Sequence, residues 1–233
     1  MYVFMFIIFI AVIYTIIPFI LSRWVGLGVL KKAGKAAAGQ NKVAFTFDDG
    51  PSPKYTNELL DLLQQNEIKA SFFVVGSEAE KYPGIILRMH REGHLIGIHN
   101  YVHRSNWLMT PWRVQQDLEK SANIIKGITG TKPKFYRPPW GMLNLFDFFT
   151  HKDYKIILWS LMVGDWRSKG GSKKREEGIL NGIKPGDIIL LHDSGETWGA
   201  NKDAPQYTIA ALKTVFRELS KRGYIYKRID EFY

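Results

Sequence analysis

The stretch KVAFTFDDGPSP, residues 42–53, decides the fold. Its first six residues form a mostly apolar run that predicts a buried strand, and Asp48-Asp49-Gly50-Pro51 end that strand. Neighbouring side chains on a strand point to opposite faces. The two carboxylates can therefore face different partners, one a metal ion and the other a water or a proton. Asp-Gly and Gly-Pro are also ordinary turn residues, so a plain polar turn is the alternative.

Strand-like and helix-like segments alternate through the rest of the chain. Such alternation is typical of a parallel sheet with helical crossovers, and several of the strands are apolar on both faces, as covered parallel strands are. A distorted barrel and an open doubly wound sheet both fit. The expected strands are 42–47, 70–75, 94–99, 134–137, 155–161, 187–191 and 224–229. The expected helices are 56–66, 78–91, 111–126, a short piece near 143–151, 173–182 and 205–222.

Polar residues follow several of these strands. In parallel α/β folds, functional sites are built at the carboxyl edge of the sheet, so these groups should gather on one rim. They are Asp48 and Asp49, His99, Arg137, Asp165, and the pair His192-Asp193.

The segment HNYVH carries two imidazoles four residues apart, at His99 and His103. On a helical turn this spacing would let both bind one ion. Together with Asp49 on the same rim they would make an open metal site of two histidines and one carboxylate. The alternative is a pair of surface histidines in a polar loop.

Two further groups suit acid–base chemistry. Arg137, held between a strand and two prolines in RPPWG, would keep a nearby carboxylate ionised, or would cap carbonyls in a structural role. His192 ends the buried strand of GDIILLHD. Opposite a metal site it is a candidate general acid, and otherwise a hydrogen-bonded core histidine.

Five motifs, TFDDG, HNYVH, RPPWG, WSLMVGDW and IILLHD, occur in this order over residues 42–193. In this order they resemble the motifs of the polysaccharide deacetylases, the NodB homology domain of carbohydrate esterase family four. The resemblance implies a distorted (β/α) barrel of about seven parallel strands. It also implies metal-dependent removal of N-acetyl or O-acetyl groups from sugar polymers.

Matched position by position, the resemblance implies that Asp49, His99 and His103 bind a divalent ion, most often zinc or cobalt. Asp48 would be the general base and Arg137 would orient it.

The resemblance gives further roles to residues around this centre. The backbone N–H of Trp140 would stabilise the oxyanion, and His192 would protonate the leaving amine. Leu190 and Trp166 would form an apolar slot for the acetyl methyl group.

The sequence departs from the family pattern where the acid that normally orients the general-acid histidine is replaced by Met162. A thioether is only a weak acceptor, so another group must hold the far nitrogen of His192. We predict that Asp165 does so, with a backbone carbonyl as the alternative. Asp193 should point to the opposite side of its strand.

Residues 1–22 contain no charged side chain and are long enough to cross a bilayer. A cleaved signal would have a basic start and a shorter apolar region, so we expect an uncleaved membrane anchor. Residues 23–41 then form a basic linker, and residues 42–233 the catalytic domain. Four basic residues after the span predict a cytoplasmic domain. The implied chemistry places the domain outside the cell, and we favour outside because long domains translocate largely regardless of flanking charge.

The composition narrows the partners. The chain has no cysteine, which excludes thiolate metal sites, disulfides and cysteine nucleophiles. Its net charge of +10 is not organised into a nucleic-acid-binding run, so the expected partners are a carbohydrate polymer and the membrane. We expect an N-deacetylase of peptidoglycan or a chitin-like polymer. An O-deacetylase and a weakly active or inactive sugar-binding protein remain alternatives, and the oligomeric state stays open.

Overall fold

The fold is built around one central strand, β2 (Lys42–Asp48). All of its residues after Lys42 are buried, because helices and neighbouring strands cover both of its faces. It pairs in parallel with β3 (Ser71–Val74) on one side and with β8 (Ile188–His192) on the other. The register sets Asp48 beside His192, so these two polar strand ends lie at the same level.

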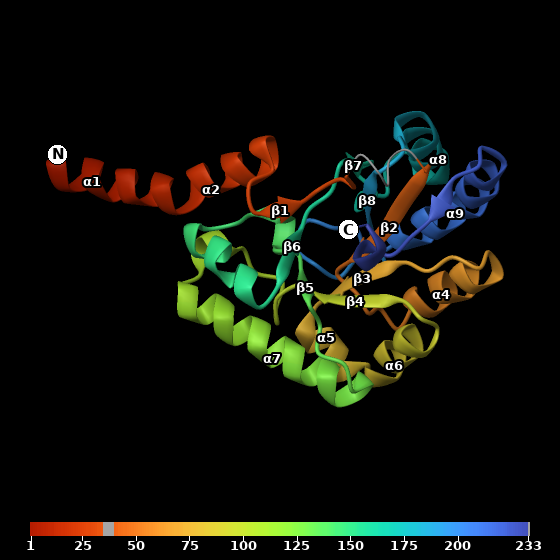
Figure 1. Ribbon diagram of the computed structural model, residues 1–233, viewed down its shortest axis with the longest axis horizontal. Helices are drawn as coiled ribbons and strands as arrows, with labels where there is room; N and C mark the ends of the chain where they lie inside the picture. The colour runs from red at the N-terminus through yellow and green to blue at the C-terminus, as the bar shows by residue number, and fades with distance from the viewer. Residues whose placement is uncertain (35–39, 233) are drawn as a thin grey trace.

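The computed structural model describes residues 1–34 and 40–232, with the exception of the side chains of residues 150–152. Within these residues one sheet of nine strands runs in the order β1-β6-β5-β4-β3-β2-β8-β7, with β9 paired to β2, and its strand pairs are parallel. The expected distorted (β/α) barrel of parallel strands is thereby confirmed, in the form of a half-barrel (Figure 1). The remaining strands are β1 (Val29–Leu30), β4 (Leu95–Ile98), β5 (Phe135–Tyr136), β6 (Lys155–Ile157), β7 (Leu161–Met162) and β9 (Ile225–Tyr226).

The predicted single strand 155–161 is wrong, because the structure divides it into β6 and β7. The first part pairs with β5 and the second with β8, so the chain between them crosses from one side of the half-barrel to the other. The carbonyls of Ile157, the last residue of β6, and of Leu158, the first residue of this crossing, accept hydrogen bonds from the Arg137 guanidinium at 3.2 and 3.1 Å.

Helices lie along the outside of the sheet (Figure 1). The predicted helix 78–91 is two helices, since Tyr82-Pro83 interrupts it and Pro83 begins the second. The helices of the domain are α4 (Thr56–Gln65), α5 (Gly76–Lys81), α6 (Pro83–Arg91), α7 (Pro111–Thr129), α8 (Gly171–Gly182) and α9 (Ala204–Lys221). Short 3₁₀ segments are η3 (Asn106–Leu108), η4 (Pro139–Gly141), η5 (Leu145–Lys152) and η6 (Ile229–Glu231).

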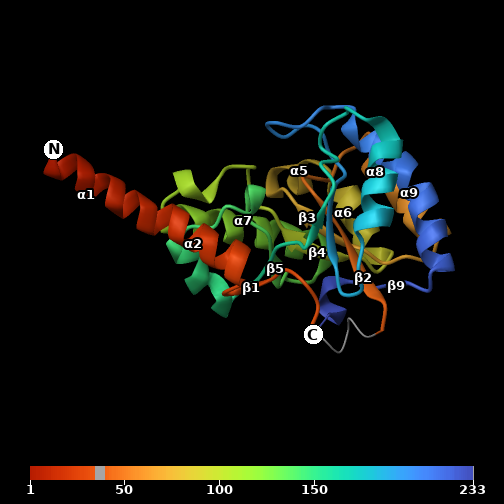
Figure 2. The same ribbon diagram turned by 90° about the horizontal axis from the view of Figure 1, so that it is seen from above.

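An apolar helix over Tyr2–Val25 precedes the domain, and its mean hydropathy of 2.8 and its length suffice to cross a membrane. It comprises α1 (Tyr2–Ala11), α2 (Ile17–Ile20) and two π-helical segments between and after them. Pro18 lies inside the helix, and π-helical turns are a common adjustment around such a break. The first part projects away from the domain, whereas α2 lies beside it (Figure 2).

The segment expected to be a linker, 23–41, is partly built into the sheet. Val29 and Leu30 form β1 against β6, and the Ala33 N–H donates to the Gly186 carbonyl at 2.8 Å. Lys32 also forms an ion pair of 3.2 Å with Asp187. Residues 35–39 of the expected linker lie outside the described residues. Residues 29–33 therefore tie the helix to the domain.

Candidate active site

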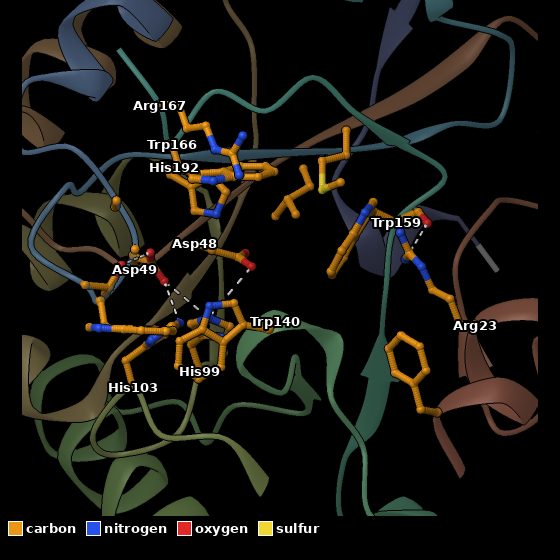
Figure 3. Close-up of a pocket in the computed structure, with 17 residues that line it drawn as sticks. Arg23, Asp48, Asp49, His99, His103, Trp140, Trp159, Trp166, Arg167 and His192 are labelled. Carbon is orange, nitrogen blue, oxygen red and sulfur yellow. Dashed lines mark hydrogen bonds and ion pairs between the residues drawn. The ribbon is translucent and has the colours of Figure 1, made fainter. Parts of the chain in front are cut away.

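The polar residues predicted to meet on one rim do so at the carboxyl ends of the parallel strands. Asp48, Asp49, His99, His103 and His192 line one cavity of about 410 Å³, a size typical of small-ligand sites. Figure 3 shows Asp48 near its centre, with His192 on one side and His99 on the other.

Arg137 is fully buried and holds Asp48. Its Nη1 donates to Asp48 Oδ1 at 2.6 Å and to Thr46 Oγ1 at 2.8 Å. The guanidinium also lies 4.1 Å from the centre of the Phe73 ring. Burying this cation is tolerated because a carboxylate, a hydroxyl and two carbonyls satisfy its donors. Asp48 is thus held in one orientation by a charge-assisted hydrogen bond.

Asp49, His99 and His103 form a cluster whose ligand atoms all lie within 4.8 Å of one another. Both Nε2 atoms lie 3.3 Å from Asp49 Oδ1. The two histidines do not sit on the helical turn that their spacing suggested. A loop brings them together, in which Asn100 adopts a positive φ of 60° and donates from Nδ2 to the Arg104 carbonyl at 3.0 Å.

The cluster fits a divalent cation. Asp49 Oδ1 is buried and has no hydrogen-bond partner, although both imidazoles point toward it. A cation between the three groups would satisfy this orphaned oxygen, and two histidines with one carboxylate suit zinc or a similar ion. The Nδ1 atom of His99 lies 2.6 Å from the Arg137 carbonyl oxygen. This contact would direct the opposite ring nitrogen, Nε2, toward a metal.

The local electrostatics also favour the protonation states in which Asp49 and His103 can bind a metal ion. Burial alone would raise the pKa of Asp49, but the nearby imidazoles of His99, His103 and His192 lower it, so the carboxylate is ionised. Burial lowers the pKa of His103 to about 4. This imidazole is therefore neutral near pH 7, the form that binds a metal.

His192 is held by Asp165 and not by Asp193. Its Nδ1 lies 2.9 Å from Asp165 Oδ1, and its backbone N–H donates to Asp165 Oδ2 at 2.8 Å. This is the contact expected from the sequence to replace the missing acid at Met162. Asp193 instead accepts from Thr56 Oγ1 at 2.5 Å. Burial alone would lower the pKa of His192, but the Asp165 carboxylate outweighs it and raises the pKa to about 10.

The residues expected to touch the substrate also line the cavity. Leu190 is buried on β8, and the Trp166 ring lies 5.8 Å from that of His192. Trp140 has a positive φ of 55°, and its ring packs edge-to-face on His103 with 4.2 Å between centroids. Met162, at the position where the family pattern has a carboxylate, is 43% exposed and lines the same cavity.

Comparison with known proteins agrees with this geometry. A family model described as polysaccharide deacetylase matches residues 35–145. A peptidoglycan-N-acetylglucosamine deacetylase of Bacillus cereus is 34% identical over 199 residues, which are 83% of this chain and 72% of that protein. The chain belongs to the polysaccharide deacetylase family. A second Bacillus cereus peptidoglycan-N-acetylglucosamine deacetylase is 35% identical and covers 81% of this chain and 86% of its own length.

Solved structures of polysaccharide deacetylases share the fold. The crystal structure of the Bc1960 peptidoglycan N-acetylglucosamine deacetylase superposes with a TM-score of 0.82 at 29% identity, covering 92% of this chain and 97% of that one. A family 4 acetyl xylan esterase from Clostridium thermocellum, solved with a cobalt ion, has a TM-score of 0.73 at 32% identity, over 82% of this chain and 89% of that one.

Sequence reasoning missed several residues of this deacetylase site. Thr197 donates from Oγ1 to Asp49 Oδ2 at 2.5 Å, and it follows β8 on the same rim, a position that could have pointed to it. Thr208 Oγ1 lies 3.3 Å from Asp165 Oδ2 and supports that carboxylate. Phe19 and Arg23, from the apolar helix, line the cavity as well. No local pattern reveals this, since it depends on how the helix packs.

Proposed function

We propose that this chain is a metal-dependent hydrolase that removes N-acetyl groups from amino-sugar residues of a cell-wall polysaccharide. One observation carries the proposal. A two-histidine, one-carboxylate cluster shares its cavity with an arginine-held carboxylate and an aspartate-held histidine. The names of the relatives support the substrate, because the two Bacillus cereus relatives described above are peptidoglycan-N-acetylglucosamine deacetylases.

In this proposal Asp49, His99 and His103 hold the divalent ion, and Asp48 acts on the attacking water. A bound divalent ion would supply Lewis acidity toward the water and the acetyl carbonyl. Asp48 would accept a proton from the water as its oxygen adds to the carbonyl carbon. The Arg137 hydrogen bond to Oδ1 fixes the orientation of Asp48, whose other oxygen, Oδ2, lies 3.9 Å from His99 Nε2.

His192 would complete the reaction. As the carbon–nitrogen bond breaks, the protonated imidazole would donate a proton to the amide nitrogen, and the products are acetate and a free amine. Asp165 would hold the opposite ring nitrogen and stabilise the imidazolium. Trp140 would offer its backbone N–H to the oxyanion, and Leu190 and Trp166 would enclose the methyl group.

Acetate release from defined substrates tests the function. We expect the purified full-length protein to release acetate from peptidoglycan fragments and from N-acetylglucosamine oligomers. Release from acetylated xylan alone would favour the O-deacetylase alternative. No release from any of the three, with metal supplied, would leave a sugar-binding protein as the better account.

A substitution at Asp165 tests the proton donor. We expect Asp165→Asn to lower turnover and to move the alkaline limb of the pH–rate profile to lower pH. The carboxylate raises the pKa of His192, so its loss lowers that pKa, and the general acid is then deprotonated at a lower pH. An unchanged alkaline limb would remove Asp165 from this role. Asp203→Asn, a change outside the cavity, serves as the matched control.

We also propose that residues 1–22 anchor the chain in the cell membrane by a single span, with 42–233 as the catalytic domain outside. The apolar helix and the cell-wall substrate of the relatives support this arrangement. Protease added to intact cells should then degrade the domain while a cytoplasmic marker survives. Protection of the domain until the cells are lysed would place it inside instead.

A further inference from the structure

One wall of the active-site cavity comes from the end of the N-terminal helix. Phe19 and Arg23 line the same cavity as Asp48 and His192. Arg23 enters from the side opposite Asp49 and His103, with the Trp159 ring between (Figure 3). A substrate that fills this cavity would therefore touch both the metal cluster and the membrane helix.

The length of the helix sets the level of the cavity relative to a bilayer. Along the described helix, the first side chain that forms a hydrogen bond to the domain is Tyr14, whose hydroxyl donates to the Met109 carbonyl at 2.6 Å. Residues 2–13 alone measure about 18 Å, which is about 12 Å short of a 30 Å hydrocarbon core. Residues 14–21 must supply the rest, so Phe19 would lie near the edge of the core and Arg23 among the headgroups. A tilted helix spans less of the bilayer thickness per residue, so tilt would bring the domain closer to the hydrocarbon core.

The surface of the domain beside the helix suits this depth. The Tyr14 ring lies 6.2 Å from Phe146, which lies 5.9 Å from Phe149, and Phe19 packs edge-to-face on Trp107. Exposed apolar side chains in these segments form what we call the helix-flanking patch. It consists of Leu108 (83% exposed), Trp112 (67%), Phe146 (43%) and Phe149 (69%). Aromatic side chains of this kind favour the membrane interface, and a lipid surface would cover them.

The Arg23 guanidinium has hydrogen-bond donors that are available to a ligand. Its guanidinium carbon lies 4.3 Å from the centre of the Trp159 ring, and its Nη1 donates a long hydrogen bond of 3.5 Å to the Trp159 carbonyl. Among the described residues, no carboxylate forms an ion pair with it. The buried Trp159 Nε1 also has no hydrogen-bond partner. Stacked and mostly unpaired, the guanidinium can offer its planar fork to a phosphate.

The charges around the cavity favour an anion. Arg23 and Arg167 both line it. Among the residues that the structure describes, the carboxylates lining it are Asp48, paired with Arg137, and Asp49, in the metal cluster. A phosphate next to the sugar would therefore be attracted to Arg23 at the headgroup level.

We propose that the site takes an N-acetylated amino sugar joined through phosphate to a membrane lipid. Arg23 binds the phosphate, the acetamide reaches the metal cluster, and the lipid chain stays in the bilayer beside the helix-flanking patch. This inference rests on the proposed deacetylase function and narrows its substrate to glycans still attached to the membrane.

Three substrates in parallel test the inference with the full-length protein reconstituted in vesicles. They are polyprenyl-diphosphate-linked N-acetylglucosamine in the same vesicles, N-acetylglucosamine 1-phosphate in solution, and neutral N-acetylglucosamine oligomers. We expect the highest kcat/KM for the lipid-linked sugar. The soluble phosphate separates recognition of phosphate from recognition of a membrane-held substrate.

Variants of Arg23 test whether this residue causes the preference for the lipid-linked sugar. Losing a charge-assisted hydrogen bond costs about a factor of ten to a hundred. We expect Arg23→Gln to lower, by about that factor, the ratio of kcat/KM for the lipid-linked sugar to that for the neutral oligomers, and Arg23→Lys to lower it less. Because a ratio is measured, a general loss of folded protein does not imitate the effect. Arg217→Gln, on the exposed face of α9, should leave the ratio unchanged.

Two outcomes would overturn the inference while leaving the deacetylase function intact. One is deacetylation of the neutral oligomers or of N-acetylglucosamine 1-phosphate with a kcat/KM equal to or higher than that for the lipid-linked sugar. The other is an Arg23→Gln ratio that matches the wild type. Failure of the wild type on every substrate, with metal supplied, would overturn the proposed function and this inference together.

Discussion

Replacing Asp48 with Asn is expected to lower kcat for deacetylation by about 10²–10⁴-fold, the usual contribution of a general base. The amide keeps the shape of the carboxylate but cannot accept the proton of the attacking water. Arg137 donates to Asp48 Oδ1 at 2.6 Å and would be left without its anionic partner. The three proposed metal ligands are untouched. Acetate release, measured beside metal content, therefore separates loss of the base from loss of the metal.

The matched control is Asp61→Asn, an exposed carboxylate of α4 whose partner is the surface residue Arg88. It should retain wild-type turnover. Near-normal turnover of Asp48→Asn would show that Asp48 is not the base. The proposed mechanism of hydrolysis would then be wrong.

The second large effect is expected from Asp49→Ala. Asp49 Oδ1 faces both imidazoles at 3.3 Å, so its removal takes away the one anionic ligand of the cluster. Mutating a residue that hydrogen-bonds to a metal ligand typically lowers metal affinity roughly 10–100-fold. Removing Asp49, a ligand itself, should lower the affinity by more than this. Turnover should fall with it, and excess metal should restore part of the activity. Titration of metal into the apo-protein, followed by calorimetry, measures the affinity directly.

Thr197→Val provides a graded comparison for this prediction. Thr197 donates to the other oxygen of Asp49 and positions it without belonging to the cluster. Its loss should weaken metal binding less than the loss of Asp49. Unchanged metal affinity in Asp49→Ala would contradict the proposed ligand set.

The gathering of the site residues on one rim could be predicted because parallel strands share a carboxyl edge. Asp48, His99, Arg137 and His192 each end or follow a different strand, so locating the strands located the residues. The replacement of the missing acid by Asp165 was predictable for a related reason. It follows the strand segment that pairs with β8, which carries His192.

Other features depend on tertiary packing that no local pattern encodes. The apolar run 155–161 reads as one strand, but its two ends have different partners, so it divides between β6 and β7. The two histidines of HNYVH converge through a loop with Asn100 at positive φ, whereas their spacing suggested a helical turn. Arg23 appeared in the sequence only as a charge after an apolar helix. Its place in the cavity follows from the packing of that helix against Trp107 and Trp159.

Metal-dependent acetate release by the full-length protein tests the central claim most directly. The protein would be stripped with a chelator, assayed on N-acetylglucosamine oligomers and peptidoglycan fragments, and assayed again after zinc or cobalt is restored. We predict loss of acetate release on stripping, recovery with either ion, and no recovery in Asp49→Ala at the ion concentration that restores the wild type. Full activity of the stripped wild type would contradict a metal-dependent deacetylase at this site.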